Sequence, residues 1–174
     1  MTWGMLSTAS AQEIKVWKTV PVGIYQNTDE IRDAYHFRSW PVDFNAGVDS
    51  ILSQGPIAFA ATPATVNLVM VCAEDFGFRH DVSYEDLCNA ARARGLIPCS
   101  AEVVLQLRLV YDDQPRKDEQ YVAMNPIVYN DGALPGAKSI LLLSNKDPYM
   151  NSILAIAPFE KMIPCQRQFI FQLQ

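Results

Sequence analysis

The stretch "CSAEVVLQLRLVYDDQP", residues 99–115, determines the predicted architecture of the chain. Leu105, Leu107 and Leu109 alternate with other residues, and a period of two predicts a strand. The Asp-Asp-Gln-Pro sequence that follows is typical of a turn. "QYVAMNPIV" (120–128) has the composition of a returning strand. The stretch therefore predicts a capped turn that leads into a core strand and a hairpin.

Other segments predict further strands. "VWKTVPVGIY" (16–25) is rich in β-branched and aromatic residues, and Pro21 places it at a sheet edge because proline donates no ladder hydrogen bond. "TVNLVMVCA" (65–73) is a nearly continuous apolar run that suits the interior of a sheet. Three more strands are predicted towards the end of the sequence, at 138–144, 151–159 and 167–173.

Helix signals occur in three segments, at 27–40, 45–56 and 83–95. In the first, Asn27 and Glu30 have the spacing of a capping box. In the third, Ser83 is an N-cap and Gly95 provides the left-handed stop. The predicted fold class is therefore α+β, with about three helices in the N-terminal half and a mainly antiparallel sheet in the C-terminal half.

Length and composition predict one globular domain. The chain has 174 residues, of which 49% are hydrophobic and 19% charged, and this balance supports a packed core. Residues 1–13 carry no helix or strand pattern, so we expect a loose tail before a single α+β domain over 14–174. Ala9-Ser10-Ala11 has signal-peptidase spacing, but no basic region and no apolar run of roughly 7–15 residues precedes it. We expect a cytoplasmic protein, with secretion as the alternative if translation starts further upstream.

The charge distribution restricts the partners. The formal net charge is −5 and the basic residues are scattered, so the chain lacks the basic patch that nucleic-acid binding requires. No apolar run approaches the ~20 residues of a membrane span. We therefore expect a protein partner, and neither nucleic acid nor membrane. The sequence leaves the oligomeric state open.

Metal and cofactor sites are not expected. No two of the cysteines have C-x-x-C spacing, which favours reduced, buried thiols over disulfides; they are Cys72, Cys88, Cys99 and Cys165. The acidic segment "EDFGFRHD" (74–81) lacks the ligand spacing of a calcium loop, and the chain contains no glycine-rich phosphate-binding motif.

Cys99, Glu102, Arg108 and His80 are the candidate site residues. Cys99 precedes a short helical turn, whose N-terminus would lower the thiol pKa and create a nucleophile, with His36 or His80 as its base. Glu102 and Arg108 would orient a substrate carboxylate or phosphate, or hold a buried junction together. The strand period places Arg108 away from the leucines, towards solvent or a sheet edge. The sequence favours an architectural role for all of these groups, with Cys99 as a small apolar side chain.

The central motifs resemble a family of uncharacterised bacterial proteins. "ARARGLIPCSAEVVLQLRLVYDDQP" (91–115) and "YVAMNPI" (121–127) are similar to that family's L-C-P-A-E-V-G, Q-L-R-L-x-Y-x-D-Q-P and I-A-M-E-P-I segments. "WKTVPVGIYQNTDEIRDAY" (17–35) and "VMVCAEDFGF" (69–78) also resemble it, so the likeness covers most of residues 16–132.

This sequence departs from the family pattern inside its core. Ser100, Val104 and Asn125 stand where the family has proline, glycine and glutamate, and the final strand lacks the family's tryptophan. The missing glutamate argues against a required acid at that position. The resemblance implies a fold pattern and a bacterial, cytoplasmic setting, and it implies no chemistry.

Two functional hypotheses follow. The first is a non-enzymatic interaction or regulatory protein, since no catalytic motif stands out. The second is a small enzyme with its site at the Cys99–Glu102–Arg108 junction, together with His80. Convergence of these groups on a concave pocket would indicate the enzyme.

Overall fold

The structure is a computed structural model that describes residues 14–37, 43–44, 46–54, 57–129, 137–145, 153–158 and 160–174. The predicted tail, residues 1–13, lies outside these ranges. The helices are α1 (Thr28–His36), α2 (Ala46–Gln54), α3 (Tyr84–Arg92), α4 (Ala101–Val110) and the short 3-10 helix η1 (Ala73–Phe76). The strands are β1 (Lys18–Val22), β2 (Asp43–Phe44), β3 (Ala64–Val71), β4 (Val82–Ser83), β5 (Leu96–Ile97), β6 (Glu119–Val122), β7 (Ile127–Tyr129), β8 (Ala137–Ser144), β9 (Ile153–Pro158), β10 (Met162–Ile163) and β11 (Phe169–Leu173).

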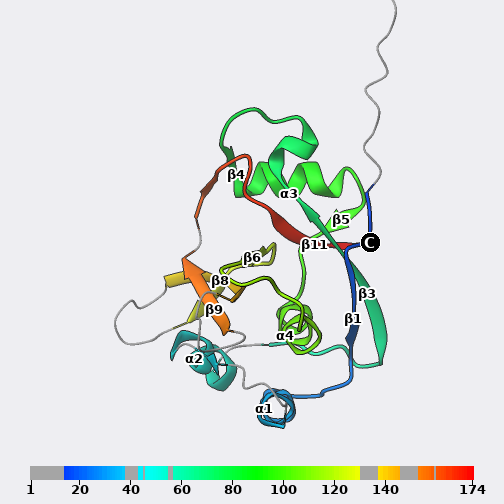
Figure 1. The fold of residues 1–174 in the computed structure, drawn as a ribbon, viewed down its shortest axis with the longest axis vertical. Coiled ribbons are helices and arrows are strands. Elements are labelled where there is room, and N and C mark those ends of the chain that lie inside the picture. The colour runs from blue at the N-terminus through cyan, green and yellow to red at the C-terminus, as the bar shows by residue number, and fades with distance from the viewer. Residues whose placement is uncertain are drawn as a thin grey trace, which may run out of the picture.

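One mixed sheet organises the molecule (Figure 1). Its strand order is β1-β3-β11-β6-β8-β9-β2, with β5 beside β11 and β7 beside β8. The β11–β6 and β2–β9 pairs are parallel, whereas the other pairs in this sheet are antiparallel. The last strand, β11, lies between a strand of the N-terminal half and a strand of the C-terminal half, and so joins the two.

The α+β class is confirmed, but the predicted distribution of its elements is wrong. Strands occur along the whole chain and not only in its C-terminal half, and the sheet is mixed because the β11–β6 and β2–β9 pairs are parallel. The reason is the position of β11, which has to pair with β3 on one side and with β6 on the other. A sheet confined to the C-terminal half would leave β1 and β3 without that partner.

The predicted strand over 105–111 is also wrong, because residues 105–110 belong to helix α4 and Tyr111 is its C-cap. Ser100 caps this helix by accepting a hydrogen bond from the N–H of Val103. Every side chain from Glu102 to Arg108 is buried, and a helix that is covered on all sides shows no polar stripe. The alternating leucines therefore fit the period of a strand only by coincidence. The predicted hairpin does not form either, since β6 pairs with β8 and β11.

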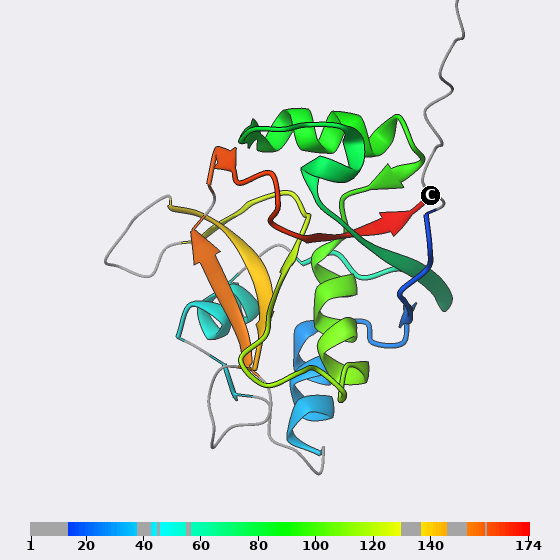
Figure 2. The ribbon, with the colours of Figure 1, turned by 45° about the horizontal axis from the view of Figure 1, so that its top comes forward.

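Helix α4 stands in the middle of the molecule (Figure 2). The β8–β9 pair lies on one side of it and β1 on the other, while α1 packs against it from below. The hydroxyl of Tyr35 on α1 donates to the Leu105 carbonyl of α4 at 2.5 Å, which fixes the two helices together. The position that the sequence assigned to a core strand is therefore occupied by a core helix.

The local signals at the other helices are confirmed. The Asn27 side chain accepts from the Glu30 N–H at 2.9 Å, and Ser83 accepts from the Asp86 N–H at 3.0 Å. Gly95 follows α3 with a φ of 75°. The inward residues predicted for α2 are buried, namely Val48, Ile51 and Leu52. The strands β1 and β3 occupy the predicted edge and interior positions.

Gly23 packs closely against the backbone of the segment at Thr62. It has a φ of +70°, and a Cβ atom there would lie 2.2 Å from the Thr62 carbonyl oxygen. Two requirements therefore select glycine, the left-handed backbone and the contact with the neighbouring segment. Gly95 has a similar φ of +75° but open space around the position of its Cβ.

Comparing Gly23→Ala with Gly95→Ala separates these two effects. Gly95→Ala should lower the free energy of unfolding by about 1 kcal/mol, the cost of a left-handed alanine. Gly23→Ala should cost at least about 2 kcal/mol more, because the methyl group meets the backbone of Thr62. Urea denaturation of both variants measures the difference. Equal losses would show that the Thr62 segment moves aside freely.

Candidate functional site

Cys99 lies between β5 and α4 and is buried. Its N–H donates to the Ala123 carbonyl at 2.7 Å, and its Sγ lies 3.8 Å from the Ile170 carbonyl oxygen. Only 4% of the residue is exposed. Burial raises the pKa of the Cys99 thiol to about 12, so the thiol stays protonated at neutral pH. A protonated thiol is a poor nucleophile.

Glu102 holds two distant backbone segments against the first turn of α4. Its Oε1 accepts from the Gly23 N–H at 2.6 Å, and its Oε2 accepts from the Ala60 N–H at 2.7 Å. The residue is 2% exposed. Hydrogen bonds from amides to a charged acceptor are among the stronger ones in proteins. The carboxylate thus ties the turn after β1 and the segment before β3 to the helix.

Arg108 performs the corresponding task at the other end of α4. Its guanidinium donates to Gln114 Oε1 at 2.6 Å and to the Tyr111 carbonyl. Gln114 in turn donates to the Leu143 carbonyl of β8 at 3.1 Å, and its own carbonyl accepts from Asn145. The expectation that Arg108 faces solvent or a sheet edge is wrong, because α4 is buried on every side and Arg108 is 1% exposed.

The four predicted residues occupy different places. Glu102 and Arg108 lie roughly 9 Å apart along the helix axis, at ~1.5 Å per residue, and bind different segments. His80 is exposed on the loop between η1 and β4. Cys99 borders an open groove of about 430 Å³, which is also lined by Ala58, Ser100, Ala101 and residues 124–128.

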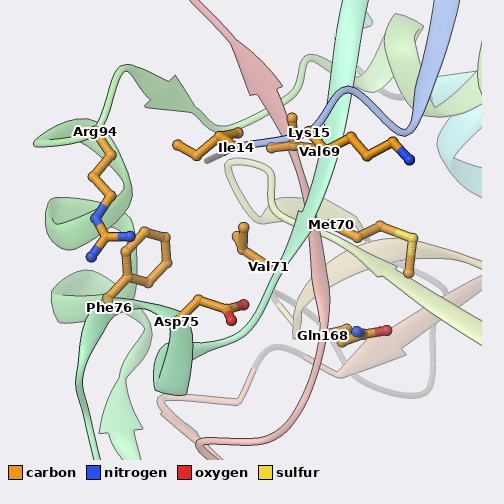
Figure 3. A pocket seen from close by; sticks show the side chains of 9 residues that line it. All are labelled: Ile14, Lys15, Val69, Met70, Val71, Asp75, Phe76, Arg94 and Gln168. Atoms are coloured by element: carbon orange, nitrogen blue, oxygen red, sulfur yellow. The ribbon is translucent and has the colours of Figure 1, made fainter. Parts of the chain in front are cut away.

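A second cavity lies at the edge of β3, where the sequence indicated no site. It has a volume of about 260 Å³, and Figure 3 shows the residues that line it. Val69, Met70 and Val71 of β3 form one wall. Ile14 and Lys15, ahead of β1, form another. The remaining lining residues are Asp75, Phe76, Arg94 and Gln168.

Charged groups of both signs border this cavity. The Arg94 guanidinium lies 5.2 Å from the centroid of the Phe76 ring, a cation–π distance. Asp75 Oδ2 accepts from the Cys72 N–H at 2.7 Å, which orients the carboxylate. Lys15 also lines the cavity, and its ammonium group points away from Arg94 and Asp75 (Figure 3). No local sequence pattern indicates this cavity, because it depends on where β1 ends relative to β3.

Metal-ligand clusters are not found in the part of the chain that the structure describes. There, no group of three histidine, cysteine or acidic side chains is placed to hold an ion. All four cysteines are within the described ranges and are free. Among the helices of those ranges, none combines the length and the hydropathy that a bilayer crossing needs.

Comparison with known proteins found no family model, no curated protein and no solved structure that matches this chain. The resemblance to a bacterial family therefore stays a prediction. Functional inference rests on the geometry of the described residues.

Glu102→Gln tests the role of the carboxylate. Glutamine keeps the shape, but its amide nitrogen would face one of the two backbone N–H groups and leave that donor unpaired. The free energy of unfolding should fall by about 2–3 kcal/mol. Glu85→Gln, at an exposed position on α3, is the control and should change it by less than about 1 kcal/mol. Similar effects for the two variants in urea denaturation would contradict the role assigned to Glu102.

The pH dependence of stability tests the environment of Cys99. The pKa is about 12 in the folded chain and near the ordinary 9.0 in the unfolded chain. Because the folded chain holds the thiol proton more tightly than the unfolded chain, the protonated thiol favours folding. This contribution to the free energy of unfolding is complete below about pH 9. It is lost as the pH rises towards 12, at about 1.4 kcal/mol per pH unit. The advantage of the parent over Cys99→Ala should therefore shrink between about pH 9 and pH 11. A constant difference across that range would show that the thiol is accessible to water.

Proposed function

We propose that this chain is a non-enzymatic interaction or regulatory protein, and that the Cys99–Glu102–Arg108 junction is architectural. The observation that carries the proposal is the hydrogen bonding of Glu102, whose two carboxylate oxygens both accept backbone N–H groups. Each oxygen of this buried carboxylate already binds a backbone N–H, so the group holds two chain segments in place.

The states of the other three candidate residues support the same conclusion. The raised pKa of Cys99 keeps the thiol protonated, and His80 lies on a separate, exposed loop. Arg108 is buried, and its guanidinium donates hydrogen bonds to Gln114 and to the Tyr111 carbonyl in the turn that follows α4. Glu102 and Arg108 thus connect separate segments of the chain to the central helix.

A small enzyme remains the second candidate because Cys99 borders the groove of about 430 Å³ at the N-terminus of α4. In that case a substrate would have to bring or recruit a base that can remove a proton from a thiol with a pKa of about 12. The buried hydrogen bonds of Glu102 and Arg108 favour the architectural alternative.

The setting of the proposed function follows from composition and resemblance. The net charge of −5 supports a protein partner over nucleic acid. The resemblance of residues 91–127 to bacterial proteins supports a bacterial, cytoplasmic setting.

Complementation of a gene deletion in the native host tests the proposal. Cys99→Ala removes the thiol with little change in volume, so an architectural residue predicts a protein that folds and restores the phenotype. Thermal melting of the same variant is the control for folding. A variant that melts within about 2 °C of the parent but fails to complement would show that the thiol acts chemically.

A further inference from the structure

The edge of β3 is open beyond the end of β1. The β1–β3 pairing covers Ala64 to Leu68 of β3, whereas the pairing with β11 on the other side continues to Val71. Within the described residues, Val69, Met70 and Val71 therefore have no strand partner on the β1 side. A cavity of about 260 Å³ borders this stretch of β3, and Ile14 and Lys15, ahead of β1, also line it (Figure 3).

The cavity lies against the edge of the strand and not against one of its faces. Side chains of successive strand residues point to opposite faces, so a cavity bordered by three consecutive residues must lie at the edge. The Leu68 carbonyl accepts from the Trp17 N–H at 2.7 Å and so points towards β1. Because main-chain groups alternate in direction along a strand, the N–H and C=O of Met70 also point to that side. They face the cavity.

The two exposed edges of this part of the sheet differ in their protection. The edge strand β1 contains Pro21 and Lys18, residues that hinder pairing with another chain. Residues 69–71 of β3 are Val-Met-Val and contain neither a charge nor a proline. The unprotected segment is therefore the one that borders the cavity.

The charges around the cavity complement an acidic ligand. Lys15 and Arg94 both line it, against the single carboxylate of Asp75, one oxygen of which already binds the Cys72 N–H. Arg94 is held over the Phe76 ring, so its position is set before any ligand arrives. An extended segment with an aspartate or glutamate would find main-chain partners at Met70 and a cation at Arg94.

We propose that an extended, acidic segment of a partner protein binds here as an added strand, through the main chain of Met70 and a carboxylate–Arg94 contact. This inference rests on the proposed interaction function. It specifies the binding site, the main-chain mode of recognition and the charge of the partner.

A peptide library tests the proposal on the intact protein. The library contains C-terminally amidated peptides of about ten residues, enough for one strand, so that only side chains supply carboxylates. Enriched peptides should contain an acidic residue. Their affinity should fall roughly tenfold or more in Met70→Pro, which removes the edge-facing N–H, and stay within about threefold in Met70→Leu, which keeps it.

A matched pair of arginine variants tests the charge contact. Arg94→Gln should weaken binding by about 5- to 30-fold, whereas Arg92→Gln should leave it within about twofold, since Arg92 is exposed on α3 and bonds Asn89. N-methylation of single peptide amides keeps the test independent of protein folding. Methyl groups at alternate positions that face β3 should abolish binding, and those between them should not.

The outcomes separate the two proposals. Peptides that bind equally well to Met70→Pro and to the parent would overturn strand addition while leaving the interaction function in place. The absence of any enriched acidic peptide would also overturn it. The interaction function itself fails only if Cys99→Ala folds normally and does not complement.

Discussion

The carboxylate of Glu102 is the contact on which the arrangement around α4 depends. It accepts the N–H groups of Gly23 and Ala60, which belong to the turn after β1 and to the segment ahead of β3. Those segments also touch each other, because Gly23 packs against the Thr62 backbone. Burying a carboxylate is costly unless it is hydrogen-bonded, and here each of its two oxygens accepts one backbone N–H. Through Glu102 the central helix sets the positions of β1 and β3, and therefore the shape of the edge between them.

The other end of α4 is fixed by a second buried charge. Arg108 binds the turn after the helix and, through Gln114, the main chain of β8. A single helix therefore connects the N-terminal strands to the C-terminal strands, and β11 makes the same connection within the sheet. Glu102 and Arg108, whose residue types suggest catalysis in the sequence, here form hydrogen bonds with backbone groups in the buried interior. The cavity at the β3 edge lies outside this arrangement, which leaves it free for binding.

The ends of individual helices can be predicted from the sequence. The burial of a whole helix and the register between strands cannot. The caps at Asn27 and Ser83 and the stop at Gly95 act over a few residues, so their spacing predicts the two helices α1 and α3 correctly. Helix α4 was misread because burial on all sides removes the polar stripe on which the helical period depends. The same error assigned Arg108 to the surface. The cavity at Met70 depends on where β1 ends relative to β3, which is a property of strand register that no local pattern contains.

Hydrogen exchange at two backbone amides tests the central claim most directly. In the parent protein the amides of Gly23 and Ala60 should exchange slowly, since both donate to Glu102. In Glu102→Gln both should exchange faster, by about tenfold or more, while the Gly95 amide, which donates to the Arg92 carbonyl, keeps its rate. Exchange at unprotected rates in the parent, or unchanged protection of both amides in the variant, would contradict the view that this carboxylate organises the fold.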